Sequence, residues 1–324
     1  MKKLILLLGL TSIFMLQAAA QDFPKVLEED RVKSLAPVRS HPVQMVLDTD
    51  TFNEIDDQFA LVYSLVSPEL DVLAVYAAPF HNSRSEGPGD GMEKSYEEIL
   101  RILDKMGLKP DGFSFRGSTD FLRDLGKPHR SPAALDLVAR AQNSSPEEPL
   151  YVVAVGAITN VASAILIEPS IIRNIVVVWL GGNGLNWPNQ KEFNFRQDLL
   201  ASRTVFDSGV PLVQLPCTPV VTHFLTTVPE MERYLSGKGP TAEYLLEIFK
   251  DYHEDHFAWS KVLWDMTAVA WVITPDWLPS PLVHTPIVTD QYTISADASR
   301  HFMRSVYFVR RDPIFRDFFE KLAK

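Results

Sequence analysis

Acidic side chains are concentrated in one short segment, where Asp48, Asp50, Asp56 and Asp57 fall within ten residues. Carboxylates this close repel one another, and a hard divalent cation bound by oxygen atoms relieves that repulsion. The segment therefore predicts a divalent-metal site, where a bound water could be activated for hydrolysis. The alternative is an acidic cap at the start of a surface helix, a position where aspartate is favoured.

Local sequence patterns place these carboxylates between a strand and a helix. The apolar run 43–47 is typical of a buried strand, and the apolar residues from Phe59 to Val66 recur with helical spacing. Ligands of open α/β sheets bind at such junctions, beyond the carboxyl ends of the strands. We therefore expect the acidic segment to belong to a functional site.

Strand and helix patterns alternate along the rest of the chain. Further strands are predicted at 71–78, 150–155, 175–180, 212–215 and 305–309. Helices are predicted at 92–106, 158–167, 199–206, 264–273 and 313–322, with one or two more within 229–257. This alternation predicts an α/β single domain with an open, mostly parallel, doubly wound (Rossmann-like) sheet and additional C-terminal helices.

The first twenty residues have the three parts of a secretory signal peptide. Lys2 and Lys3 are basic, residues 4–16 are apolar, and the alanines at 18–20 offer a cleavage site. We expect residues 1–20 to be removed from a bacterial protein that is exported to the periplasm. An uncleaved N-terminal anchor is the alternative. Residues 21–42 then form a polar lead-in, and residues 43–324 form the functional domain.

The composition excludes several classes of partner and site. A net charge of −10 argues against nucleic acid and anionic membranes as partners, because both are themselves negative. No later segment is long and apolar enough to span a membrane, so no stable membrane association is expected after cleavage. Cys217 is the only cysteine, which excludes an internal disulfide and a multi-cysteine zinc site.

Four later segments also place polar groups at the ends of predicted strands or helices. They are residues 155–160 (VGAITN), 180–183 (LGGN), 192–194 (EFN, with Asp198 beyond) and 263–265 (LWD). Together with the acidic segment, and in this order, they resemble the nucleoside hydrolase family of the inosine-uridine preferring type, which are calcium-dependent N-ribosyl hydrolases. The resemblance covers the chain from Val43 to the C-terminal helix.

The resemblance implies a Ca²⁺ cofactor and identifies its ligands. Asp50, Asp57 and Asp265 match the family's side-chain ligands, and Val155 matches a position whose main-chain carbonyl binds the ion. Asp50 also matches the general base beside the attacking water. The spacing between Asp50 and Asp56 is longer than in the family's most compact pattern, in a form that the family also uses.

The resemblance also implies a set of ribose-binding groups. Asp56 matches the carboxylate that accepts hydrogen bonds from the ribose hydroxyls. The other matches are Asn82, Asn186, Glu192 and Asn194. Asn183 and Asn189 are alternatives to Asn186, and His81 is an alternative to Asn82.

Trp264 occupies the position before the last calcium aspartate, where many family members carry a histidine that protonates the leaving base. A tryptophan there resembles the purine-preferring branch, in which an aromatic ring stacks on the base; such stacking contributes about 1–3 kcal/mol in single-strand binders. The alternative is a core aromatic residue at a helix start, which leaves the base preference open. Another acid must then serve, with His81, His223 and His256 as candidates; Trp259 could also stack on the base.

These matches predict an enzyme that hydrolyses the N-glycosidic bond of ribonucleosides, with a preference for purines, to ribose and free base. A calcium-bound water attacks, and Asp50 is the general base. Acidic and amide groups around the sugar recognise its hydroxyls. A role in purine salvage and a homodimer or homotetramer follow from the resemblance alone.

Three alternatives remain open at this point. An exported protein that binds nucleosides without catalysis would share the site, although buried carboxylates without a task are costly. A substrate such as nicotinamide riboside or another N-riboside would keep the chemistry. Asp48-Thr49-Asp50-Thr51 resembles the haloacid-dehalogenase phosphatase motif, but that reading leaves Asp56 and Asp57 unexplained, and the chain lacks a convincing late acidic pair.

Overall fold

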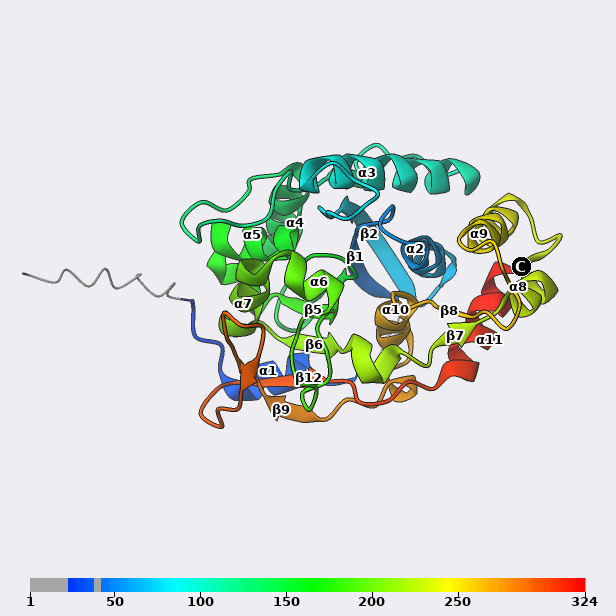
Figure 1. The fold of residues 1–324 in the computed structure, drawn as a ribbon. Helices are drawn as coiled ribbons and strands as arrows, with labels where there is room; N and C mark the ends of the chain where they lie inside the picture. Colours follow the sequence, from blue (N-terminus) through cyan, green and yellow to red (C-terminus); the bar gives the residue numbers. More distant parts are fainter. Residues whose placement is uncertain (1–22, 38–41, 324) are drawn as a thin grey trace, which may run out of the picture.

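An eight-stranded sheet runs through the centre of the molecule (Figure 1). The computed structural model describes residues 23–37 and 42–323. Neighbouring strands are parallel, except that β12 and β9 are antiparallel. This confirms the open, mostly parallel α/β sheet. In spatial order the strands are β3 (Ser114–Arg116), β2 (Leu70–Ala77), β1 (Val43–Thr49), β4 (Leu150–Ala154), β5 (Ile175–Leu180), β6 (Leu212–Leu215), β12 (Phe302–Ser305) and β9 (Leu282–His284).

Side chains alternate between the two faces of the sheet, and helices cover both faces. In β5, Val176 and Val178 belong to one apolar core, whereas Val177 and Trp179 belong to the other. Burial on both faces explains why the central strands are continuously apolar. The first core is covered by α2 (Asp56–Val66), α3 (Pro88–Lys105), α10 (Met266–Ile273) and α11 (Arg311–Leu322). The second core is covered by α4 (Pro132–Gln142), α5 (Thr159–Ile167) and α7 (Leu199–Asp207).

The direction of strand addition reverses between β1 and β4. From β1 the chain adds β2 and β3 on one side, then crosses back to add β4, β5 and β6 on the other. Asp48 in β1 pairs with Ala154 in β4, so Asp50 and Val155 follow the ends of adjacent strands. Such a switch point at the carboxyl ends of the strands is where doubly wound sheets bind ligands.

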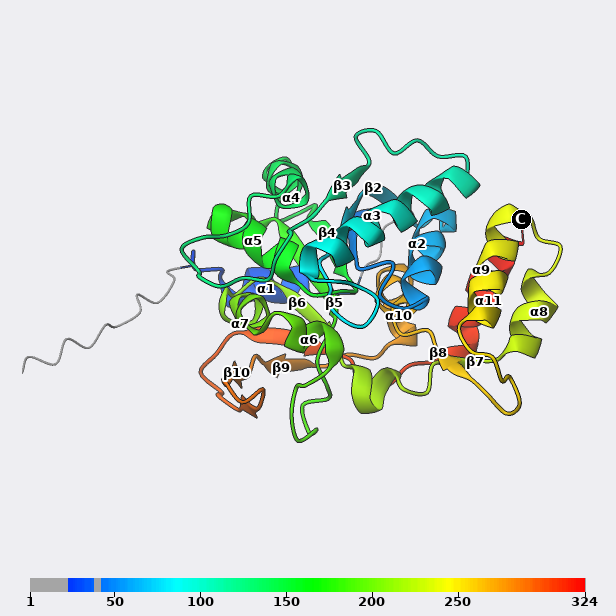
Figure 2. The same cartoon turned by 45° about the horizontal axis from the view of Figure 1, so that its top comes forward.

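Smaller elements surround this frame. Helices α8 and α9 lie beside α11 at one end of the molecule, and the β7–β8 ribbon leads from them towards α10 (Figures 1 and 2). These elements are α1 (Glu28–Ser34), α6 (Phe193–Gln197), α8 (Val228–Leu235), α9 (Pro240–Asp251), β7 (Leu225–Thr226), β8 (Lys261–Val262), β10 (Ile287–Val288), β11 (Ile294–Ser295) and the short helices Pro169–Arg173, Cys217–Val221 and Pro275–Trp277.

The N-terminal lead-in packs onto the domain instead of projecting from it. Its described part contains α1, where Arg31 Nε and Nη2 donate to the carbonyl oxygen of Gly209 at 3.1 and 3.0 Å. Leu35 is fully buried in the first core. The predicted signal peptide, residues 1–20, lies outside the described residues. None of the described helices is long and apolar enough to cross a membrane.

Two predicted elements need correction. The last strand covers residues 302–305 and not 305–309, because residues 306–310 leave the sheet before α11. The apolar helix begins at Met266 and not at Trp264, because β8 extends to Val262 and a turn follows it. Residues 229–257 contain two helices, α8 and α9, within the predicted range of one or two.

Candidate active site

A cavity of about 340 Å³ lies at the carboxyl ends of β1, β4 and β5. It combines the acidic segment with the segments after β4 and β5 and the residues before α10. The structure therefore brings together most of the residues that the sequence predicts for the site. Those that line the cavity are Asp50, Asp56, Asp57, Asn82, Val155, Glu192, Asn194, Trp264 and Asp265.

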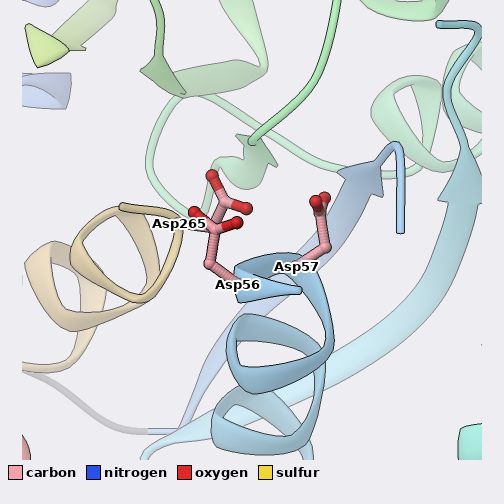
Figure 3. A group of neighbouring side chains, drawn as sticks. All are labelled: Asp56, Asp57 and Asp265. Atoms are coloured by element: carbon pink, nitrogen blue, oxygen red, sulfur yellow. The ribbon is translucent and has the colours of Figure 1, made fainter. Parts of the chain in front are cut away.

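Three aspartates in the cavity are arranged as metal ligands. Asp56 and Asp57 form the first turn of α2, and Asp265 immediately precedes α10. One carboxylate oxygen from each lies within 4.8 Å of the others. The Asp56 and Asp265 carboxylates lie together between the two helices, and Asp57 lies above the start of α2 (Figure 3). All three residues are buried. Oxygen ligands from two helix starts are the donor set that Ca²⁺ or Mg²⁺ would use.

Asp50 adds a fourth buried carboxylate, and it lacks a hydrogen-bond donor. Its exposed fraction is 0%, and neither of its oxygens accepts a hydrogen bond among the described residues. A buried carboxylate without a partner is costly, so a cation is the expected partner. Gly156 permits this placement, because a Cβ there would lie 3.0 Å from Asp50 Cγ.

Two threonines near the end of β1 orient the Asp57 carboxylate. Thr49 Oγ1 donates to Asp57 Oδ1 at 2.5 Å, and Thr51 Oγ1 lies 3.1 Å from Thr49 Oγ1. This pair fixes the direction in which Asp57 faces the cavity. The sequence analysis missed the role of Thr49, although its position between Asp48 and Asp50 was a signal that could have been used.

Asn194 links the ends of two strands at the cavity wall. Its Nδ2 donates to the carbonyl oxygen of Val155 at 2.8 Å and to that of Leu180 at 3.1 Å. Val155 and Asn194 both line the cavity, and this hydrogen bond uses one lone pair of the Val155 carbonyl oxygen. That oxygen retains a second lone pair for another partner.

Glu192 is held rigidly at the start of α6. Its carboxylate accepts from the backbone N–H groups of Gly182 (2.8 Å), Asn194 (2.9 Å) and Phe195 (3.1 Å). Burial raises the pKa of Glu192, and these three donors oppose that shift. Gly182 adopts a φ of +75°, and a Cβ there would lie 2.5 Å from Gln190 Oε1, so the turn requires glycine.

Two predicted ribose contacts are not at the cavity. Asn186 is exposed on a turn that projects from the loop before α6, and Asn183 lines the cavity instead. The Asn183 side chain is fixed, because Nδ2 donates to Asn189 O at 3.0 Å and Oδ1 accepts from Thr218 N at 3.2 Å. His81 is also exposed and lines a neighbouring pocket.

Asn82, rather than His81, takes the position at the cavity rim. Its Nδ2 donates to Asn53 Oδ1 at 2.7 Å, and its Oδ1 accepts from the backbone N–H of Arg84 at 2.8 Å. Asn53 belongs to the longer spacing between Asp50 and Asp56 and also lines the cavity. The longer spacing thus supplies a partner that positions Asn82.

One buried cation, which the sequence analysis missed, lies behind the acidic residues. Lys261 pairs with Glu54, and its Nζ lies 4.0 Å from Asp56 Oδ1. Burial alone would lower the pKa of Lys261, but Asp56 and Glu54 outweigh burial and raise it. The ammonium group offsets part of the negative charge and holds Asp56 in place. Its position four residues before Asp265 was the available signal.

Metal-free carboxylates in the cavity retain protons to unusually high pH. Burial, with neighbouring carboxylates, raises the pKa values of Asp50 and Asp265 well above their ordinary range. Burial also raises the pKa of Asp57 to about 7 and that of Asp56 to about 6, the latter opposed by Lys261. A divalent cation would compete with these protons and lower the pKa values.

Without metal, the protein should lose stability as pH rises from about 4, the pKa of aspartate in an unfolded chain, to about 7. In that range the folded state binds more protons than the unfolded state, so the free energy of unfolding falls with pH. Urea unfolding in chelator at several pH values measures the slope. In Asp57→Asn the free energy of unfolding should fall less as pH rises. An equal or steeper fall would contradict the raised pKa of Asp57.

Trp264 is partly buried, packs on the first core and lines the cavity beside Asp265. None of the described residues lining this cavity is a histidine. His223 Nε2 lies 2.9 Å from Val309 O, and His256 Nε2 lies 2.9 Å from Lys250 O, so both are engaged elsewhere. Trp259 contacts Phe249 and does not line the cavity.

Asp48 lies behind the cavity and not in it. Its Oδ1 accepts from Asn160 Nδ2 at 2.8 Å, and the same amide group donates to Ala77 O at 3.2 Å. Asp48 is fully buried and does not line the cavity. It therefore cannot serve as the aspartyl nucleophile that the phosphatase alternative requires.

Known proteins are similar to this chain in sequence and in fold. The sequence profile of the inosine-uridine preferring nucleoside hydrolase family matches residues 45–309. Pyrimidine-specific ribonucleoside hydrolase RihA of Citrobacter koseri is 30% identical over 251 residues, covering 68% of this chain and 77% of that protein. RihA of Klebsiella pneumoniae is 31% identical over 263 residues, covering 72% and 80%.

Solved structures agree in fold. The plant nucleoside hydrolase PpNRh1 superposes with a TM-score of 0.70 at 18% identity, over 87% of this chain and 99% of that one. The purine-preferring ribonucleoside hydrolase from Gardnerella vaginalis superposes with a TM-score of 0.67 at 20% identity, over 86% and 98%. Because the profile match covers most of the chain, the protein belongs to the inosine-uridine preferring nucleoside hydrolase family and is an N-glycosyl hydrolase.

Proposed function

We propose that the protein hydrolyses the N-glycosidic bond of purine ribonucleosides, releases ribose and free base, and uses Ca²⁺ as its cofactor. The observation that carries this proposal is the Asp50 carboxylate, buried without a donor beside Asp56, Asp57 and Asp265. Four buried carboxylates in one cavity support a cation site, and the amide side chains of Asn82 and Asn194, which we propose to bind the sugar, line the same cavity.

The residues present fit a calcium ion. Asp50, Asp57, Asp265 and the carbonyl of Val155 would hold it, an all-oxygen donor set with a high negative charge. When bound, the ion lowers the pKa of a coordinated water and orients the sugar hydroxyls. Among the described residues Lys261 pairs with Glu54 and Asp56 only, so it neutralises little of the negative charge of the cavity carboxylates. This favours a bound divalent cation over a structural network of ion pairs.

The protein's own groups then divide the work of hydrolysis. Asp50 takes a proton from the attacking water, and Asp56 accepts hydrogen bonds from the ribose hydroxyls. Glu192 and Asn194 bind the sugar with little reorganisation, because backbone groups already hold them. The surrounding carboxylates stabilise the positive charge that develops on the ribosyl ring in the transition state.

Trp264 contributes at the base. Because none of the described cavity-lining residues is a histidine, stacking on Trp264 takes over part of the activation of the leaving base. A purine offers a larger π face than a pyrimidine, so this contact favours purines. The RihA relatives are named pyrimidine-specific, which makes the base preference the sharpest point to test.

Replacing Trp264 by alanine should lower kcat/KM for inosine about 5- to 150-fold, because stacking contributes about 1–3 kcal/mol per base. The loss for uridine should be smaller. The matched control is Trp187→Ala, on the exposed turn outside the cavity. Equal losses for inosine and uridine would remove stacking as the source of purine preference.

The proposed function is tested by incubating the mature chain and Ca²⁺ with inosine, guanosine, adenosine, uridine and cytidine and measuring released ribose. Purine-selective release supports the proposal. Pyrimidine release keeps the hydrolase and removes the role of Trp264. Binding without release from any of the five would indicate a non-catalytic binding protein, and release only from another N-riboside would change the substrate.

We also propose export to the periplasm and assembly as a homodimer or homotetramer. Residues 1–20 carry the signal-peptide pattern that supports export. N-terminal sequencing of the secreted chain should begin near Gln21, and light scattering of the purified protein should give twice or four times the chain mass. A chain that retains Met1, or a monomer, would contradict these two proposals.

A further inference from the structure

A second pocket, of about 310 Å³, adjoins the candidate active site. The two share Lys191, which lines both. The other residues around the second pocket are His81, Phe121, Arg196, Gln197 and Tyr292. It is formed where four segments meet: the loop after β2, the loop after β3, α6 with the residues just before it, and the turn between β10 and β11. Helix α6 and β10 both lie in the lower half of Figure 2.

The charge of this second pocket is opposite to that of the active site. Lys191 and Arg196 are basic side chains, His81 is a third, and no carboxylate is among the described residues lining it. The active-site cavity is lined by six carboxylates, and the whole chain carries a net charge of −10. The pocket is therefore a basic region on an otherwise acidic protein, and its charge favours binding of an anionic group.

The two cations are available to a ligand. No ion pair among the described residues involves Lys191 or Arg196. The Arg196 guanidinium lies over the Phe193 ring, 5.5 Å from its centroid, and Phe193 itself lines the active-site cavity. By contrast, Arg203 on the following helix is paired with Asp290.

The walls of the pocket are held by specific contacts. The backbone N–H of His81 donates to Gln197 Oε1 at 2.8 Å, which ties the loop after β2 to α6. The backbone N–H of Gln190 donates to Tyr292 O at 2.6 Å, which ties the loop before α6 to the hairpin. Tyr292 adopts a φ of +60°, an uncommon conformation for a residue other than glycine. These hydrogen bonds hold three of the segments that line the pocket in fixed positions: the loop after β2, α6 with the loop before it, and the β10–β11 turn.

The position of the cations identifies which part of a substrate they reach. Residues 191–196 carry the proposed sugar contacts Glu192 and Asn194, with Lys191 before them and Arg196 after them. The 2′,3′-diol of a riboside is the pair of hydroxyls that the acidic end of the cavity recognises in the proposed function. The 5′-hydroxyl is then the remaining hydroxyl that can carry a substituent towards the basic pocket.

We propose that this pocket is a phosphate subsite, and that the enzyme also accepts ribonucleoside 5′-monophosphates. Arginine binds a phosphate monoester through paired N–H donors, and lysine adds a point charge. In the reaction the bond between C1′ and the base nitrogen breaks, water oxygen bonds to C1′, and a water proton ends on the base. The products are ribose 5-phosphate and free base, with the phosphate ester intact. The assignment of the 5′ end rests on the proposed function.

Binding of products to the calcium-loaded mature protein tests the subsite. Calorimetric titration with ribose 5-phosphate should give a Kd at least about 10-fold lower than titration with ribose, because hydrogen bonds to a charged phosphate are stronger than those to a neutral hydroxyl. Inorganic phosphate added together with ribose should not reproduce the gain, which distinguishes a linked phosphate from a free one. Arg196→Gln should remove most of the gain and leave ribose affinity unchanged; Lys191→Gln should also reduce the gain.

The matched control is Arg233→Gln, an exposed arginine on α8 at the other end of the molecule. Equal affinity for ribose and ribose 5-phosphate, or a gain that survives Arg196→Gln, would overturn the subsite. A parallel assay compares inosine with inosine 5′-monophosphate. If inosine is hydrolysed but ribose 5-phosphate binds no more tightly than ribose, only the subsite is refuted. If ribose 5-phosphate binds more tightly but no substrate is hydrolysed, only the proposed function is refuted.

Discussion

Replacing Asp50 by asparagine should lower kcat/KM for ribose release by about 10³-fold or more, because general-base catalysis alone contributes about 10²–10⁴-fold and a metal ligand is lost with it. Asparagine keeps the shape of the side chain but removes the charge and the basic oxygen. Steady-state kinetics with saturating Ca²⁺ measure the loss. Activity within about 10-fold of wild type would remove Asp50 from the mechanism.

The same variant should not be destabilised when metal is absent. The buried Asp50 carboxylate accepts no hydrogen bond from the part of the chain that the structure describes, so removing its charge should leave the free energy of unfolding in chelator unchanged or higher. The matched control is Asp71→Asn, an exposed carboxylate near the opposite end of the sheet, at the start of β2. That control should retain full activity. A large loss of stability in Asp50→Asn would instead indicate a structural role for this carboxylate.

Removing divalent cations should abolish hydrolysis, and adding Ca²⁺ should restore it. Burial and neighbouring carboxylates raise the pKa values of the four aspartates in the metal-free protein, so the charged carboxylates are costly there and Ca²⁺ should also raise the melting temperature. A free Ca²⁺ concentration 100 times Kd stabilises the folded state by about 2.7 kcal/mol. Thermal unfolding and ribose release are measured on one chelated sample as Ca²⁺ is added.

The midpoint of the activity curve should lie near the Ca²⁺ concentration at which the melting temperature begins to rise, because one ion serves both. Asp57→Asn and Asp265→Asn should each shift that midpoint to higher Ca²⁺. The matched control is again Asp71→Asn, which should leave the midpoint unchanged. Full hydrolysis in excess chelator, or stabilisation by Ca²⁺ without recovered activity, would contradict the proposed role of the ion.

Local signals were sufficient to predict the central strands and most of the cavity, but not β3, α4 and β9. The apolar runs of β1, β4 and β5 are continuous because both faces of these strands are buried, which makes them easy to recognise. Asp50 and Val155 follow strand ends, so the sheet itself brings them together. Residues attached directly to regular elements were therefore predicted in their correct places.

Residues that depend on loop geometry were not predicted reliably. Asn183 and Asn186 differ by three positions, and only the turn anchored by Gly182 and Gln190 decides which one faces the cavity. Lys261 reaches Asp56 through pairing of β8 with β7, a contact that no local pattern reveals. These side chains are set by long-range packing, which spacing along the chain does not encode.

The fold partly stabilises the negative charge that is concentrated at the site. Asp56 and Asp57 lie in the first turn of α2, where the helix dipole favours carboxylates, and Thr49 and Lys261 contact them. Asp50 alone receives no such donor among the described residues. The least compensated carboxylate is thus also the one proposed to bind the ion and to accept the proton.

A crystal structure with Ca²⁺ and ribose would test whether the buried aspartates bind the ion beside the sugar. We predict one ion at 2.3–2.6 Å, the range typical of Ca²⁺–oxygen distances, from oxygens of Asp50, Asp57, Asp265 and the Val155 carbonyl. Ribose should lie against Asp56, Glu192 and Asn194. An ion bound elsewhere, or ribose bound in an active crystal with no cation among these aspartates, would contradict the account.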